Sequence, residues 1–208
     1  MRLGILDYGA GNLRSVLNAF SSIGSPGALV TTPEQFGQID ALIFPGQGAF
    51  GDAARQLHER QLWEPLKDWL KAQKPYFGIC LGYQLLFESG AESPGVEGLC
   101  TFRGTVPRFE AKPGLKIPHM GWNTVKFMDP TRPIWRGLGV DTSFYFVHSY
   151  YPKPADASLA ACLTDYEGEF TSGIIAPNLV AVQFHPEKSQ AVGLGILRNF
   201  ITSVPVGV

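Results

Sequence analysis

The sequence predicts a three-layer α/β fold in which a mostly parallel central sheet is extended by antiparallel strands. Over the first half, short apolar runs alternate with segments of helical periodicity, a pattern that builds parallel sheets through right-handed crossovers. Over the second half, strand-like runs follow one another with little helix between them, as in an antiparallel sheet. The chain has 208 residues, 45% of them hydrophobic and 17% charged. We therefore expect one globular domain covering residues 1–208.

The expected elements of the first half are short strands separated by amphipathic helices. The strands are the apolar runs RLGIL at 2–6, GALVTT at 27–32, ALIF at 41–44 and YFGI at 76–79. Apolar residues at helical spacing predict helices over 12–23 and 61–73. The run YQLLFES, which follows the fourth strand, is expected to open another helix.

The second half is expected to supply the antiparallel extension. Strand-like stretches lie at 101–106, 122–127, 144–150, 159–164, 170–176 and 179–184. A final helix is expected near 189–202. No repeat or convincing linker divides the chain.

Charge and cysteine content exclude several classes of function. The formal net charge is −1 at pH 7, so no basic excess indicates binding to nucleic acid or to an anionic membrane. Asp7 interrupts the N-terminal apolar run, no apolar run is long enough to cross a bilayer, and we expect a soluble cytoplasmic protein. The three cysteines, Cys80, Cys100 and Cys162, lack CxxC spacing, so neither a zinc site nor a disulfide framework is expected.

One cysteine lies between two glycines where an expected strand meets an expected helix. In GICLGYQLL, Gly78 and Gly82 stand two residues to either side of Cys80. This is the layout of a nucleophile elbow, in which glycine avoids collisions with neighbouring backbone. Backbone N–H groups at the helix start favour negative charge, and the N–H of Leu81 can donate to an oxyanion. The alternative is a buried core cysteine, and we interpret the other two cysteines, which lack the glycine frame, as core or boundary residues.

A cysteine nucleophile requires a base, and the base an orienting carboxylate. Of the four histidines, His185 is favoured because it ends the strand-like LVAVQF and is followed by Pro186 and Glu187. Extended residues two apart point to the same side, so Glu187 can hold one ring nitrogen while the other faces the thiol. We therefore favour a Cys80–His185–Glu187 triad. His148, in the strand-like YFVHSYY, remains an alternative base, and a strand-end histidine beside a surface glutamate is the ordinary structural interpretation.

The loop PGQGAF at 45–50 follows an expected strand at the ligand-binding edge of a parallel sheet. Its backbone at Gly46 and Gln47 could supply a second oxyanion donor, because glycine lets a peptide plane rotate at little cost. Taken alone, the loop is more simply a turn.

A second glycine pair, in DYGAGN at 7–12, does not form a dinucleotide fingerprint. The pattern GxGxxG needs glycine where this chain has Arg14. The pair is interpreted as a tight turn with Asn12 as a helix N-cap, and we expect no cofactor and no metal.

Together these motifs resemble a known family. GICLGYQLL with the downstream FHPEKS is similar to the class I, or triad, glutamine amidotransferases, which have a flavodoxin-like fold. Within that family, DYGAGN, PGQGAF, PHMGWN at 118–123 and YFVHSYY at 145–151 resemble the glutaminase subunits of imidazole glycerol phosphate synthases. The resemblance runs from residue 7 to residue 189.

The resemblance implies a mechanism for each residue of the site. Cys80 would attack the side-chain amide of L-glutamine and form a thioester. His185 would protonate the departing ammonia and then activate water, while Glu187 orients His185. The Leu81 N–H and the Gly46–Gln47 peptide would bind the oxyanion.

The resemblance also implies residues that bind the substrate and the partner. Gln84 and Glu92 match glutamine-binding positions, and backbone groups near Ser149 and Tyr150 would bind the α-carboxylate. Ammonia would pass to a (β/α)8 cyclase partner, producing imidazole glycerol phosphate and aminoimidazole carboxamide ribotide in histidine biosynthesis. The residues expected at that interface are Asn12, Trp122, Tyr145 and Lys188.

Other functions remain to be weighed against this one. The chain could deliver ammonia for pyridoxal phosphate or purine synthesis, although PHMGWN and YFVHSYY argue against that. It could be a catalytically silent regulatory module, against which the intact Cys, His and Glu set argues. One departure is Gln47, where many members of the family carry valine.

Overall fold

The computed structural model describes residues 1–10, 13–166 and 168–203. Its main sheet has nine strands in the order β2-β1-β3-β4-β12-β11-β10-β7-β8. Among the described residues, no helix has both the length and the apolar character needed to span a membrane.

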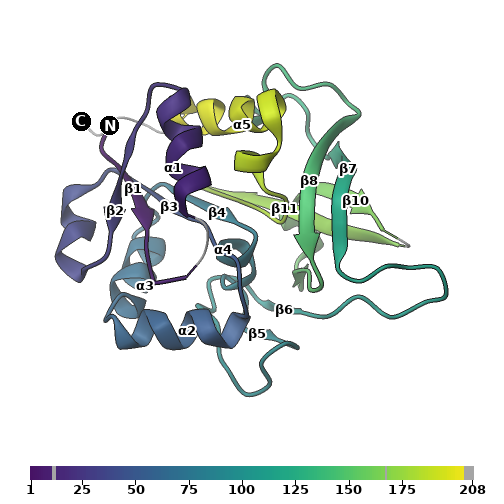
Figure 1. Ribbon diagram of the computed structural model, residues 1–208, viewed down its shortest axis with the longest axis horizontal. Coiled ribbons are helices and arrows are strands. Elements are labelled where there is room, and N and C mark those ends of the chain that lie inside the picture. The colour runs from purple at the N-terminus through teal and green to yellow at the C-terminus, as the bar shows by residue number, and fades with distance from the viewer. Residues whose placement is uncertain (11–12, 167, 204–208) are drawn as a thin grey trace.

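The first part of the sheet is parallel and lies between two layers of helices. Its strands are β2 (Gly27–Val30), β1 (Leu3–Leu6), β3 (Ala41–Phe44), β4 (Tyr76–Ile79) and β12 (Leu179–Val182). Figure 1 shows α1 (Leu13–Ser22) and α5 (Gln190–Ser203) on one face, and α2 (Phe50–Glu59) and α3 (Trp63–Lys71) on the other. One buried apolar cluster lies on each face of the sheet, so the three-layer architecture is confirmed.

The rest of the sheet is antiparallel, as the second half of the sequence predicts. Its strands are β11 (Glu169–Ala176), β10 (Ala160–Asp165), β7 (His119–Phe127) and β8 (Thr142–His148). A small second sheet contains β5 (Ser89–Gly90), β6 (Gly104–Val106) and β9 (Lys153–Pro154). Short 3₁₀ helices lie at Pro33–Gln38, Pro133–Trp135, Ala157–Leu159 and Pro186–Lys188.

The expected helix after the fourth strand is much shorter than predicted. Helix α4 covers only Leu81–Gln84. The carbonyl of Leu85 accepts the N–H of Leu99, and that of Leu86 accepts the N–H groups of residues 101 and 102. These long-range hydrogen bonds occupy acceptors that a continuing helix would need, so the chain leaves the helix after one turn.

Two neighbouring parallel strands position the candidate site. Ile79, the last residue of β4, lies beside Val182, the last residue of β12. The N–H of Cys80 donates to the carbonyl of Val182 at 2.8 Å. Residues 80 and 185 therefore leave the sheet at the same edge, where open α/β sheets bind ligands.

Candidate active site

Cys80 lies in a sharp turn between β4 and α4. Its backbone has φ 52° and ψ −97°, a region that non-glycine residues rarely adopt. A Cβ atom on Gly82 would overlap the carbonyl oxygen of Phe44, and one on Gly78 would lie 2.7 Å from the carbonyl oxygen of Gly82. The two glycines therefore let backbone segments pack at distances that any side chain would prevent, as in a nucleophile elbow.

His185 and Glu187 form a buried pair beside the cysteine. Nδ1 of His185 lies 2.8 Å from Oε1 of Glu187, and the two side chains are 1% and 4% exposed. Burial lowers the pKa of His185, but the Cys80 thiolate and the Glu187 carboxylate outweigh it and raise that pKa to about 10. Nε2 of His185 is buried without a hydrogen bond and is the ring atom left for Cys80. The raised pKa of His185 favours an imidazolium that faces the sulfur of Cys80.

The backbone expected to bind the oxyanion has its carbonyl turned inward. The N–H of Leu81 donates to the carbonyl of Gly46 at 3.5 Å. The N–H of Gln47 belongs to the same peptide and points the opposite way, toward the buried hydroxyl of Tyr8. Burial raises the pKa of Tyr8 well above its usual range, and the Gln47 N–H opposes that rise. In this conformation the Gly46 carbonyl occupies the Leu81 N–H and the Gln47 N–H is turned away, so both predicted oxyanion donors are engaged elsewhere.

A cavity of about 520 Å³ opens at the cysteine. Besides Cys80, Leu81 and Gln47, it is lined by the residues predicted for substrate and partner, namely Gln84, Glu92, Ser149, Tyr150, Tyr145 and Lys188. His185 and Glu187 do not line this cavity and lie behind the cysteine with Gly46. The tertiary structure thus collects into one site residues that are far apart in the sequence.

All four residues predicted to bind the substrate already make hydrogen bonds within the protein. Glu92 Oε2 accepts the N–H of Phe50 at 2.8 Å and so stabilises the start of α2. The carbonyl of Tyr150 accepts from Gln84 Nε2 at 3.0 Å. The carbonyl of Ser149 accepts the N–H of Phe109 at 3.0 Å. These carbonyls are used within the protein, which leaves the N–H groups near Ser149 and Tyr150 as the candidates for binding a carboxylate.

His148, the alternative base, has both ring nitrogens occupied. Its Nδ1 lies 2.8 Å from the carbonyl of Tyr150, and its Nε2 lies 3.0 Å from Nδ1 of His119. Burial lowers the pKa of His148 to about 3 and that of His119 to about 4. Two neutral histidines joined to each other have no free nitrogen for a thiol, so the geometry favours His185 as the base.

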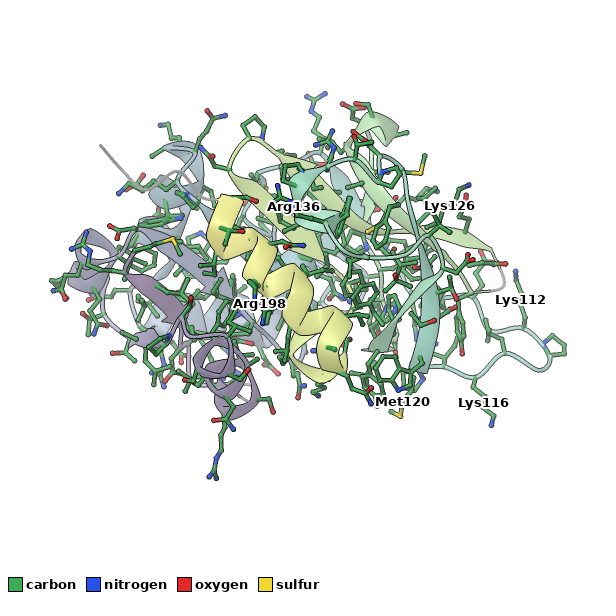
Figure 2. All side chains as sticks on the ribbon, turned by 90° about the horizontal axis from the view of Figure 1, so that it is seen from above. Lys112, Lys116, Met120, Lys126, Arg136 and Arg198 are labelled. Carbon is green, nitrogen blue, oxygen red and sulfur yellow. The ribbon has the colours of Figure 1, made fainter. Side chains whose placement is uncertain are left out.

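The predicted interface residues lie on the β7–β8 strand pair and near it. Trp122 is 49% exposed, and its ring meets that of Tyr145 edge to face at a centroid distance of 6.3 Å. Met120, on the same face of β7, is 61% exposed and projects at the rim of the molecule in Figure 2. Asn12 lies outside the described residues.

Sequence reasoning missed Gln183, which contacts the cysteine directly. The side chain of Gln183 is fully buried, and its Nε2 lies 3.3 Å from the sulfur of Cys80. The available signal was a polar residue in the otherwise apolar run LVAVQF, immediately before the predicted base. Among the described residues, no cluster of three or more His, Cys, Asp or Glu side chains could hold a metal ion.

The fold and this cysteine site define a class of protein. Residues 4–204 match the family "Glutamine amidotransferase class-I", and the chain belongs to that family. It is 46% identical over 204 residues to the imidazole glycerol phosphate synthase subunit HisH of Rhodopirellula baltica, covering 98% of each chain. It is 42% identical to the subunit of the same name from Acinetobacter baylyi, covering 96% of this chain and 97% of that protein.

Solved structures agree with the fold at much lower sequence identity. A crystal structure of a glutamine amidotransferase matches with a TM-score of 0.75 at 17% identity, covering 97% of this chain and 98% of that one. The structure of PurLQS from Thermotoga maritima matches with a TM-score of 0.73 at 15% identity, covering 97% of each chain. The class I glutamine amidotransferase fold is therefore confirmed.

Proposed function

We propose that the protein is the glutaminase subunit of an imidazole glycerol phosphate synthase and acts in the cytoplasm as a single domain over residues 1–208. The relatives that bear this name match nearly the whole chain at 41–46% identity. The observation that carries the glutaminase activity is the Cys80 elbow, with its buried His185–Glu187 pair at the same edge of the sheet.

The proposed chemistry is hydrolysis of L-glutamine through a thioester. The Cys80 thiolate attacks the side-chain amide carbon, and His185, held by Glu187, gives its proton to the departing ammonia. His185 then takes a proton from water, which attacks the thioester and releases glutamate and the thiolate. The elevated pKa of His185, about 10, keeps the imidazolium available as the acid for the first step.

The oxyanion formed in both steps needs N–H donors in the cavity. Rotation of the Gly46–Gln47 peptide would free the Leu81 N–H from the Gly46 carbonyl and turn the Gln47 N–H inward as a second donor. Gly46 has no Cβ, and a Cβ there would lie 2.7 Å from the Cβ of Leu81. While the Gly46 carbonyl points inward, we expect slow glutamine hydrolysis, and we expect faster hydrolysis once the Gly46–Gln47 peptide has rotated.

Binding of the substrate is assigned to the cavity in front of the cysteine. Gln84 and Glu92 hold the glutamine, and backbone N–H groups near Ser149 and Tyr150 bind its α-carboxylate. The volume of about 520 Å³ is ample for an amino acid.

The proposed partner is a (β/α)8 cyclase that receives the ammonia and makes imidazole glycerol phosphate and aminoimidazole carboxamide ribotide. It would dock over the cavity mouth, with Trp122 and Tyr145 packing against it and Lys188 meeting a carboxylate. An exposed tryptophan supported by a tyrosine is a typical interface anchor.

The test is glutamate release by the chain alone and with the cyclase and its nucleotide substrate. We expect low release alone, marked stimulation in the complex, and a loss of about 10³-fold or more for Cys80→Ala, because the nucleophile is removed. Cys100→Ala, which removes a cysteine remote from the cavity, is the matched control and should retain activity. Unchanged release by Cys80→Ala would remove this residue from the mechanism, and stable association with a purine or pyridoxal phosphate enzyme instead of the cyclase would assign another pathway.

A further inference from the structure

Gln183 is a buried amide in contact with the reacting sulfur. It directly follows β12, and its side chain is fully buried. Its Nε2 lies 3.3 Å from Sγ of Cys80, and its Oε1 lies 3.2 Å from Nε2 of Gln84. Both the nitrogen and the oxygen of the amide therefore make hydrogen bonds, and the nitrogen contacts the sulfur that would form the thioester.

A backbone carbonyl, which can only accept hydrogen bonds, determines which end of the Gln183 amide faces Cys80. Nε2 of Gln84 lies 3.0 Å from the carbonyl oxygen of Tyr150, which can only accept a hydrogen bond. That atom of Gln84 must therefore be its NH₂ group. Since the same NH₂ group meets Gln183, Gln183 must present its oxygen to Gln84 and its own NH₂ group to Cys80.

Two buried histidines extend this chain of hydrogen bonds to β7. The carbonyl of Tyr150 also accepts from Nδ1 of His148 at 2.8 Å, so the neutral ring carries its proton on Nδ1. Nε2 of His148 then accepts from Nδ1 of His119 at 3.0 Å, and Nε2 of His119 accepts from Nδ2 of Asn123 at 3.2 Å. Nδ2 of Asn123 also donates to the carbonyl of Asp165 at 2.8 Å, which fixes the other end.

The Asp165 carbonyl at one end and the Tyr150 carbonyl in the middle can only accept, so each hydrogen bond of the set has one possible direction. We call this set the amide–histidine chain, consisting of Asn123, His119, His148, the Tyr150 carbonyl, Gln84 and Gln183. The low pKa values that burial gives His119 and His148 agree with two neutral rings.

We propose that Gln183 is a further catalytic residue, whose side-chain N–H stabilises negative charge on the Cys80 sulfur, and that Gln84 and the Tyr150 carbonyl of the amide–histidine chain hold it in the donating direction. This inference rests on the proposed glutaminase function. The sulfur becomes negative when its proton moves to Nε2 of His185, and again when the thioester C–S bond breaks. A donor already aimed at the sulfur stabilises both states without rearrangement.

The first test follows alkylation of Cys80 by iodoacetamide from pH 5 to pH 10, with each cysteine quantified by peptide mass spectrometry. Gln183→Met keeps an unbranched side chain of similar size but has no donor, and should slow the reaction at pH 7 about 10- to 100-fold. The rate should recover at high pH. Gln183→Glu keeps the shape but places oxygen beside the sulfur, and should slow the reaction further.

Two controls separate this effect from a loss of structure. Cys100 is exposed and reports on the reagent in the same sample, so its rate should not change. Thr164→Val removes a buried hydrogen bond of 2.8 Å to Ser172 in the same sheet without touching Cys80, and should alkylate like the wild type. Equal Cys80 rates in the wild type and both Gln183 variants at every pH would overturn the proposal.

The second test measures glutamate release in the complex with the cyclase. Gln183→Met should lower kcat about 10- to 100-fold because the donor acts on the sulfur, whereas KM reports separately on Gln84, which loses the Gln183 oxygen as a partner. If the wild type itself releases no glutamate, the proposed function fails. If the wild type is active and Gln183→Met equals it, the inference about Gln183 fails by itself.

The third test reads the hydrogen positions in the unmodified protein. Long-range ¹H–¹⁵N NMR of the histidine rings should find the proton of both His148 and His119 on Nδ1 at pH 7.5. A proton on Nε2 of His148 would remove the hydrogen bond from its Nδ1 to the Tyr150 carbonyl and overturn the assignment of the two histidines to this chain, whereas the direction of Gln84 and Gln183 would still be set by that carbonyl.

Discussion

Cys80 has a backbone conformation that the surrounding residues must enforce. A non-glycine residue at φ 52° and ψ −97° is strained, and it persists because β4 and β12 fix the chain before the turn. Gly82 then lets α4 approach the carbonyl of Phe44 more closely than any side chain would permit. The glycine frame is therefore a steric requirement of the turn.

Gly82→Ala tests that requirement. The added methyl group would overlap backbone that cannot move without shifting β3, so we expect a loss of about 2 to 4 kcal/mol in the free energy of unfolding. Urea denaturation measures it. Gly37→Ala is the matched control, because nothing lies within 4 Å of a Cβ added there. Equal stability of the two variants would show that the turn can relax around a side chain.

His148 should make the stability of the protein depend on pH. Burial lowers its pKa to about 3 in the folded state, whereas about 6.5 is usual in an unfolded chain. Between pH 7.5 and pH 5 the unfolded chain gains a proton that the folded protein does not, so stability falls as the pH falls. The expected contribution is a loss of about 2 kcal/mol over this range.

The measurement compares the wild type with His148→Gln, by urea denaturation at pH 7.5 and pH 5. The variant should be less stable at pH 7.5, yet it should lose about 2 kcal/mol less than the wild type on acidification. Parallel losses in the two proteins would assign the pH dependence to other groups.

At the scale of elements, the β7–β8 pair separates a buried face from an exposed one. Alternate residues of β8 are buried, among them Phe144, Phe146 and His148, while Tyr145 lies on the other face with Trp122 of β7. The period of a strand thus places the histidine pair inside and the predicted docking aromatics outside. The same two strands carry Asn123 and the two histidines of the amide–histidine chain as well as the predicted docking aromatics.

Trp122→Ala tests the docking face. Truncating a central aromatic anchor should weaken binding of the cyclase about 30-fold or more, and the variant should remain as stable as the wild type because the side chain is half exposed. Isothermal titration calorimetry measures the affinity. Leu29→Ala, an exposed apolar residue on β2 at the opposite edge of the sheet, is the control. Unaltered affinity for Trp122→Ala would place the interface elsewhere.

The length of helix α4 is a feature that the local sequence pattern does not predict. YQLLFES has helical composition, but the carbonyls of Leu85 and Leu86 bond to the segment at 99–102. That segment is more than ten residues away in the sequence, and no local propensity indicates that it will compete.

At the scale of the whole molecule, the site depends on the position of β12 between β4 and β11 in the sheet. The chain leaves β4, builds the antiparallel strands, and returns as β12 to lie parallel to β4. This return places residue 185 beside residue 80 at the carboxyl ends of neighbouring strands. The strand order, and not proximity in the sequence, therefore unites the proposed nucleophile with its proposed base.

The sequence by itself determined the α/β class, because strand-like and helical segments alternate along the chain. It also determined the nucleophile elbow and the pairing of His185 with Glu187, because each depends on a few neighbouring residues. Gly78, Cys80 and Gly82 define a steric pattern, and an extended spacing of two puts His185 and Glu187 on one side. Only the tertiary structure decided that α4 ends after one turn, that the carbonyl of Gly46 faces Leu81, and that Gln183 donates to the sulfur. These features depend on hydrogen bonds between residues far apart in the chain, whose partners become available only once the sheet has assembled.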